Sequence, residues 1–139
     1  MGTARSYLGG CGLQTAGLAV GGSIGASKQN ITEEYDGASW TAGGTMNTAR
    51  NAVAVAGIQT AALAFGGQVP PETGATEEYN GATWTSNPTG LNTARRDSGG
   101  VGIQTEALVF GGYTGTVYSN ATEEWTGPGA LITKTITVS

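Results

Sequence analysis

The chain has 139 residues and a formal net charge of −4, from six basic and ten acidic residues. Charged residues make up only 12 % of it, whereas glycine alone accounts for 25 residues. This balance argues against a nucleic-acid partner, which needs clustered Lys and Arg, and no apolar run approaches the length of a membrane span. A single cysteine, Cys11, excludes an internal disulfide, and its position predicts a small buried side chain rather than a reactive thiol.

Three copies of a 45-residue repeat occupy almost the whole sequence. Arg5, Arg50 and Arg95 mark the same point of each copy and are 45 residues apart. The other shared markers are Gly-Gly doublets and Glu-Glu pairs, at 21–22, 66–67 and 111–112, and at 33–34, 77–78 and 123–124. A period of this length indicates a repeat architecture in which each copy is one supersecondary unit. We therefore expect a single unit over 1–139, with repeats at approximately 5–49, 50–94 and 95–139.

The first half of each repeat predicts two apolar strands, most clearly at 51–56 and 59–65. The connection at Gly57-Ile58 is short enough only for an antiparallel hairpin. Both strands carry apolar residues on both faces, so the sheet that they form must be covered on both sides.

The second half of each repeat predicts a second hairpin. Residues 76–79 form its first strand, and the next strand begins at Ala82 and runs through Trp84 and Thr85. Asn80-Gly81, like Asp36-Gly37 in the first copy, favours a two-residue type I′ turn, because that turn needs positive φ at both central residues. Each repeat is thus expected to form a four-stranded antiparallel sheet.

Loops of different length and composition separate the two hairpins of each copy, at 23–31, 68–75 and 113–121. Variation between fixed strands is typical of surface loops on a rigid frame. Their polar and aromatic side chains are our binding candidates, although an exposed loop tyrosine without a ligand is common. The candidates are Lys28, Gln29, Asn30, Glu72, Tyr113 and Tyr118.

The repeat resembles the kelch family in its Gly-Gly-terminated strand, its Thr-Ala-Arg lead-in and its Tyr–Trp pairs, Tyr35/Trp40 and Tyr79/Trp84. Two features depart from that family. The Tyr-to-Trp spacing is five residues, shorter than usual, and in the third copy Trp125 replaces the tyrosine while Gly-Pro-Gly-Ala at 127–130 replaces the tryptophan. The compact repeat also looks like kelch-type repeats of virion-associated proteins of marine bacteriophages. The resemblance implies an all-β propeller of four-stranded blades, three in this chain.

Three blades cannot close a ring, since propellers have roughly four to eight. Blades 1 and 3 would each leave an apolar face in water, which marks an interface. We expect a homodimer in which two chains, head to tail, form one six-bladed propeller. The alternative is a fragment, or a design, of a protein with more blades. The alternating tail at 130–139 predicts the outer strand of blade 3 and a natural chain end.

The Glu-Glu pairs could serve acid–base chemistry or a hard cation. They recur in every copy, however, and adjacent strand residues point to opposite faces, so the two members of a pair cannot share one site. We instead expect one Glu of each pair to meet the repeated arginine at a blade junction. Without histidine, no Ser-His-Asp triad or imidazole metal site can be formed. The sequence thus offers no catalytic residue, metal ligand or cofactor motif.

Two function classes follow from this reasoning. The first is a non-catalytic structural or interaction module, resembling a phage virion or appendage protein, whose partners would be itself and other virion proteins. The second is a lectin-like module that binds a host-surface glycan with the same loops. The first five residues are too short and polar for a signal peptide, so we expect cytoplasmic production followed by a virion or extracellular location.

Overall fold

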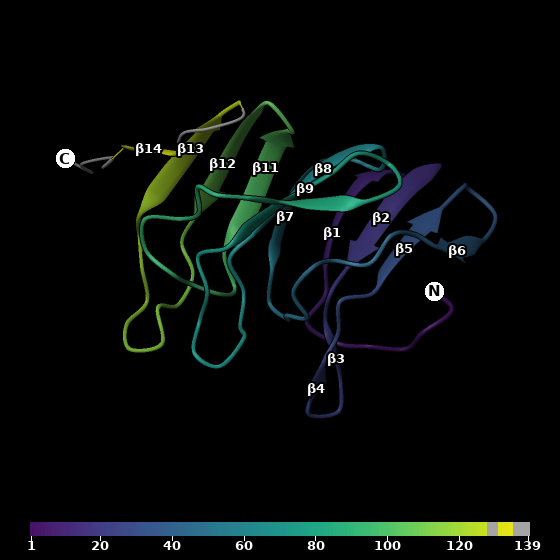
Figure 1. The fold of residues 1–139 in the computed structure, drawn as a ribbon, viewed down its shortest axis with the longest axis horizontal. Coiled ribbons are helices and arrows are strands. Elements are labelled where there is room, and N and C mark those ends of the chain that lie inside the picture. The colour runs from purple at the N-terminus through teal and green to yellow at the C-terminus, as the bar shows by residue number, and fades with distance from the viewer. Residues whose placement is uncertain (128–130, 135–139) are drawn as a thin grey trace.

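The computed structural model describes residues 1–127 and 131–134, and this part of the chain is all-β with antiparallel pairing throughout. Three four-stranded sheets succeed one another and fan out side by side (Figure 1). Sheet 1 contains β1 (Gly9–Leu13), β2 (Ala16–Val20), β5 (Thr32–Tyr35) and β6 (Trp40–Ala42). Sheet 2 contains β7 (Ala54–Ile58), β8 (Ala61–Phe65), β9 (Thr76–Tyr79) and β10 (Trp84–Asn87). Sheet 3 contains β11 (Gly99–Ile103), β12 (Glu106–Phe110), β13 (Thr122–Thr126) and β14 (Leu131–Lys134).

A short additional hairpin, β3 (Ser23–Ile24) and β4 (Ser27–Lys28), lies in the first variable loop. Strand β14 pairs with β13, which confirms the outer-strand prediction for 131–134. The rest of that predicted strand, at 130 and 135–139, lies outside the described residues. No helix long and apolar enough to cross a membrane occurs in the described residues.

The hairpin between β7 and β8 turns at Gln59-Thr60, so the predicted turn at Gly57-Ile58 is wrong by two residues. Gly57 instead lies inside the ladder opposite Ala62, with φ of 105°. A Cβ at this position would meet the oxygen of Ala61 at 2.3 Å. Glycine is therefore required by close backbone approach within the hairpin, not by the turn itself.

The hairpin between β9 and β10 does not contain the predicted type I′ turn. Strand β9 matches the prediction, but Tyr79 pairs with Trp84, which leaves a four-residue loop at 80–83. Only Gly81 has positive φ in this loop. The side-chain oxygen of Asn80 accepts from the N–H groups of Ala82 and Thr83, at 3.0 and 2.8 Å, so an Asx turn replaces the tighter one.

The equivalent loop of sheet 1 is built in the same way. Asp36 accepts from the backbone N–H groups of Ser39 and Ala38, at 2.7 and 2.9 Å. These hydrogen bonds hold the pKa of the Asp36 carboxyl below its usual range. Asp36 and Asn80 therefore stabilise these loops by accepting hydrogen bonds with their side-chain oxygens, and not by adopting a left-handed backbone conformation.

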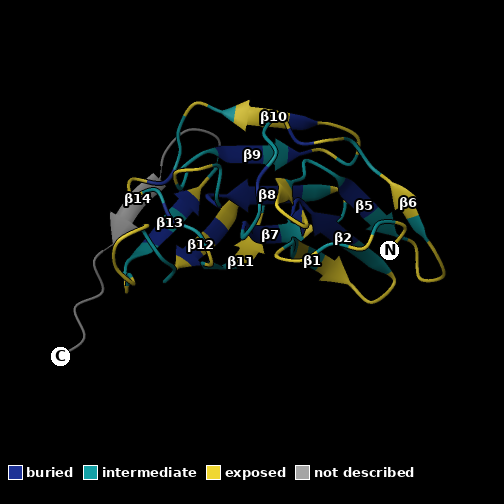
Figure 2. Cartoon of the chain, turned by 90° about the horizontal axis from the view of Figure 1, so that it is seen from below, coloured by how far each residue is buried: buried dark blue, intermediate teal, exposed yellow. Residues whose placement is uncertain are grey.

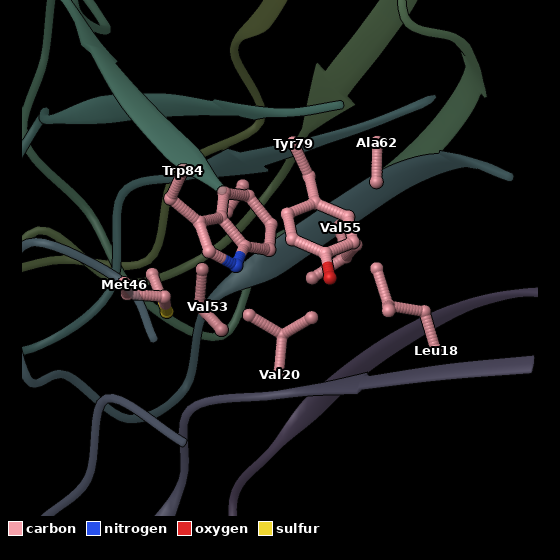
Figure 3. Close-up of a cluster of buried hydrophobic side chains, with 9 residues drawn as sticks. Leu18, Val20, Met46, Val53, Val55, Ala62, Tyr79 and Trp84 are labelled. Atoms are coloured by element: carbon pink, nitrogen blue, oxygen red, sulfur yellow. The ribbon is translucent and has the colours of Figure 1, made fainter. Parts of the chain in front are cut away.

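Two apolar clusters join neighbouring sheets. The first, between sheets 1 and 2, is drawn in Figure 3 and contains Leu18, Val20, Met46, Val53, Val55, Ala62, Ala64, Tyr79 and Trp84. The second, between sheets 2 and 3, contains Ala54, Ala56, Leu63, Phe65, Leu91, Ala107, Val109 and Trp125. Sheet 2 is thus apolar on both faces and covered on both, as the sequence predicted. Its first strand, β7, lies beside both β1 and β11, at the narrow side of the fan (Figure 2).

The single cysteine packs against the first cluster. Cys11 is half-buried, and burial raises the pKa of its thiol to about 11. At neutral pH the thiol is therefore protonated and behaves as a small apolar group. The predicted side-chain role is confirmed, although burial is incomplete.

The outer faces of sheets 1 and 3 are open, because the fan does not close into a ring. On sheet 3, Val101, Leu108 and Phe110 are 53 %, 37 % and 44 % exposed. Their counterparts in the covered sheet 2 are Ala56, Leu63 and Phe65, none of which is more than 2 % exposed. The same repeat position is therefore core in sheet 2 and surface in sheet 3.

Candidate functional site

The side chains of the three marker arginines are completely buried in ion pairs. Arg5 pairs with Glu33, Arg50 lies 3.3 Å from Glu77, and Arg95 lies 3.0 Å from Glu123. Each of these carboxylates belongs to the first member of a Glu-Glu pair, which confirms the predicted arginine contact. Buried charges of this kind are tolerated only when they are paired and hydrogen-bonded.

Arg50 shows why the pair lies at a junction between sheets. Its backbone oxygen accepts from Gly22 in the first repeat, at 3.0 Å. Its guanidinium reaches into sheet 2, where it donates to the carbonyls of Gly66 and Ala64, at 2.8 and 3.4 Å. Burial lowers the pKa of Arg50 to about 10, and the charge of Glu77 opposes this shift. The pair connects two sheets and holds the Gly-Gly end of β8.

The second member of the first pair points to the opposite face. Glu34 in sheet 1 accepts from the hydroxyl of Tyr79 in sheet 2, at 2.5 Å. Burial and this bond raise the pKa of Tyr79 to about 12. In the next sheet Trp125 replaces the tyrosine, and Glu78 instead accepts from Asn87 at 2.6 Å. Both members of the first two pairs, and Glu123 of the third, thus contact the scaffold rather than one another.

The variable loops project from one side of the fan, the lower side in Figure 1, where β3 and β4 are labelled. In the first loop, Lys28 is half-buried in β4. The side chain of Gln29 donates to the oxygen of Ser27 at 3.0 Å, and that of Asn30 donates to the oxygen of Met46 at 3.1 Å. Two of the three candidates in this loop therefore hold its own backbone and the linker that follows it.

The second and third loops come together. Glu72 of the second loop accepts from Nε of Arg96 at 3.0 Å, and the Arg96 guanidinium lies 5.1 Å from the ring centre of Tyr113. The rings of Tyr113 and Tyr118 are 5.2 Å apart, and Tyr118 is 89 % exposed. The structure therefore groups three of the six predicted candidates: Glu72, Tyr113 and Tyr118.

Tyr113 and Tyr118 border a surface hollow of about 650 Å³, which is lined by Arg96, Asp97, Gly112, Tyr113, Thr116, Tyr118 and Ser119. Arg96 and Asp97 are not among the residues predicted from the sequence. A signal was present, since Arg96 stands where the other copies have Ser6 and Asn51. The hollow combines aromatic faces, hydroxyls and one guanidinium, a set suited to a ligand with many hydroxyl groups.

The sheets and their repeated polar contacts define an all-β repeat protein with a polar and aromatic loop face. No group of His, Cys, Asp and Glu that could hold a metal ion occurs in the described residues. No protein-family model matches the chain, and no curated protein matches its sequence.

Proposed function

We propose that the chain is a non-catalytic structural and interaction module, in which the three sheets are kelch-like blades of a β-propeller. One observation carries this proposal: the repeated arginine and the first Glu of each pair are buried in scaffold contacts. The charged side chains that the repeats share therefore stabilise the fold. What differs between repeats is the loop side, and variable loops on a rigid frame are where binding resides.

The setting we propose is a phage virion or appendage. Its support is the resemblance of the compact repeat to virion-associated kelch-type proteins. Mass spectrometry of purified virions, from a phage whose genome encodes this sequence, tests the proposal. We expect the chain at a defined copy number per particle. Its absence from purified particles, with abundant free protein in the lysate, would exclude a virion role.

The second candidate function is glycan binding at the hollow beside Tyr113. The observation that favours it is the exposed Tyr118 next to Arg96 and several hydroxyls, because aromatic faces stack on sugar rings. Calorimetry with host-surface polysaccharide tests it. We expect Tyr118→Ala to abolish binding and Ile24→Ala to preserve it, since Ile24 is also exposed in a variable loop but does not line the hollow. No binding at millimolar ligand would favour the structural role alone.

A further inference from the structure

The two junctions between sheets are made by the same glutamine contact. Gln59, in the hairpin turn of sheet 2, donates to the carbonyls of Gly17 and Tyr35 in sheet 1, at 3.1 and 2.8 Å. Gln104, in the equivalent turn of sheet 3, donates to the carbonyls of Ala62 and Tyr79 in sheet 2, at 3.2 and 2.7 Å. Each turn therefore clamps the sheet that precedes it.

A second repeated contact runs along the narrow side of the fan. The N–H of Ala52 donates to the oxygen of Tyr7 at 2.7 Å, and the N–H of Asp97 donates to the oxygen of Ala52 at 3.0 Å. All three residues have left-handed φ, between 53° and 54°. The backbone thus continues one hydrogen-bond chain from sheet to sheet, which ends at the N–H of Tyr7 and the oxygen of Asp97.

The first sheet carries the same glutamine in its hairpin turn, but without a preceding sheet for it to contact. Gln14 stands at the position of Gln59 and Gln104, is exposed, and makes no hydrogen bond through its side chain within the described residues. The equivalent acceptors for Gln14 would be the carbonyls of Ala107 and Trp125 in sheet 3, at the other end of the fan. These two residues pair with each other in sheet 3 as Ala62 and Tyr79 do in sheet 2. The chain therefore presents an amide donor at one end and its two acceptors at the other.

The apolar surfaces of the two ends also match. Sheet 3 presents Val101, Leu108 and Phe110, the positions that are core in sheet 2. Sheet 1 presents Gly17, where sheets 2 and 3 have Ala62 and Ala107, and the half-buried Tyr35. At the junction between sheets 2 and 3, the ring centres of Phe65 and Trp125 are 6.0 Å apart. Phe110 is the counterpart of Phe65 on the open face of sheet 3, and Tyr35 is the counterpart of Trp125 on sheet 1. A hollow of about 350 Å³ lies on the open end of sheet 3, beside Val101, Ala107, Leu108 and Trp125.

We propose that the open face of sheet 3 binds the open face of sheet 1 of a second copy of this chain, with Gln14 donating to the carbonyls of Ala107 and Trp125. The same register brings the N–H of Tyr7 to the oxygen of Asp97. Two such contacts, related by two-fold symmetry, close a ring of about six sheets, within the roughly four to eight of closed propellers. The interface rests on the proposed reading of the sheets as blades, but not on any loop ligand.

The first test is mass in solution by light scattering and native mass spectrometry. We expect twice the 13.9 kDa mass of one chain. Leu108→Lys on sheet 3 and Gly17→Arg on sheet 1 should each yield a folded monomer, because each places a charge in the apolar contact. Ile103→Lys and Gly17→Ala are the matched controls and should remain dimeric. Ile103 is a sound control because its counterpart Ile58 stays 49 % exposed in the covered sheet.

Mixing the two monomeric variants tests the head-to-tail arrangement. Leu108→Lys keeps an intact sheet 1 face and Gly17→Arg keeps an intact sheet 3 face, so the mixture should form a one-to-one complex through a single contact. If sheet 3 instead paired with sheet 3, Gly17→Arg alone would stay dimeric, and the proposal would be overturned. Circular dichroism of each variant confirms that loss of association is not loss of folding.

The clamp has its own readout. Gln14→Ala should raise the dimer dissociation constant at least about tenfold, since it removes two hydrogen bonds at each of two contacts. An unchanged constant, a wild-type monomer, or masses that grow without limit with concentration would each overturn the closed ring. None of these outcomes bears on the virion and calorimetry tests, so the two proposals fail separately.

Discussion

Gln104 donates its side-chain amide to the backbone oxygen of Tyr79, 2.7 Å away in the preceding sheet. The same amide reaches the oxygen of Ala62, so one turn residue satisfies two carbonyls of a neighbouring strand pair. Gln59 does the same for Gly17 and Tyr35. Sheet junctions in this protein therefore combine an apolar cluster with a directional polar contact, which sets the register between sheets.

Gln104→Ala should lower the free energy of unfolding by about 1–2 kcal/mol, because two carbonyls lose their hydrogen-bond donor. Urea denaturation measures this change. The control is Gln14→Ala in the monomeric Leu108→Lys background, where the equivalent turn meets no preceding sheet. An equal loss for both glutamines would contradict the junction role.

Arg50→Met should destabilise the fold by about 3–5 kcal/mol, because it leaves the Glu77 carboxylate buried without its cation. Replacing Glu77 as well, in Arg50→Met/Glu77→Leu, should recover part of that loss, since the unpaired charge is then removed. A double variant less stable than Arg50→Met alone would argue against this explanation.

The matched control for Arg50 is Arg96→Met. Arg96 also pairs with a glutamate, Glu72, but its side chain is 31 % exposed, so its ion pair is screened by solvent. We expect a loss below about 1 kcal/mol for this variant. Both arginines are measured in the same denaturation series.

Acid should weaken the fold in part through Glu33. Burial alone would raise the pKa of this carboxyl, but hydrogen bonds from Arg5, Gly2 and Thr3 bring it below the ordinary value. A folded pKa below the unfolded value of about 4.3 stabilises the protein fully above that pH, and this stability is lost as the pH falls through the folded pKa. The denaturation midpoint should therefore decrease on acidification, and Glu33→Gln should flatten that part of the profile. An unchanged slope would rule out Glu33 as a contributor.

Gly57→Ala should destabilise the second sheet by about 1–3 kcal/mol, because φ is 105° and the new Cβ would meet the oxygen of Ala61 at 2.3 Å. Gly17→Ala is the contrast, since its φ is not left-handed and its Cβ would have no neighbour closer than 3.6 Å. We expect Gly17→Ala to leave stability unchanged or slightly raised. Thermal unfolding of both variants, in the Leu108→Lys background, makes the comparison free of association.

The order and pairing of the strands were predictable, but their bounds and turns were less so: β7 begins at Ala54 rather than at residue 51, and β10 begins at Trp84 rather than at Ala82. Strand β9 falls at the predicted residues because the β-prone Thr76 and Tyr79 bound it and the Asn80-Gly81 turn signal follows directly, although its two central residues are glutamates. The turn after Ile58 differs from the prediction because a glycine needed for close approach resembles a glycine needed for a turn. The Asn80 loop differs because an Asx side chain can cap a longer loop without left-handed backbone at its own position.

The candidate binding residues divided on similar grounds. The composition of the loops identified them as candidate binding segments. Their local sequence does not show that Asn30 donates a hydrogen bond to the backbone of Met46, whereas Tyr118 is exposed. Arg96 and Glu72 belong to different repeats, and only the packing of neighbouring loops brings them together. Departure from the repeat was the one local sign of Arg96.

The sequence alone determined the period, the all-β character and the pairing of each marker arginine with a glutamate, because side-chain periodicity and charge recur with every copy. Which of three nearly identical positions is core and which is surface depends on how the sheets pack. Leu63 and Leu108 occupy the same place in their repeats, but a third sheet covers the first and none in this chain covers the second. Burial depends on neighbours, and a repeat does not encode how many neighbours it has.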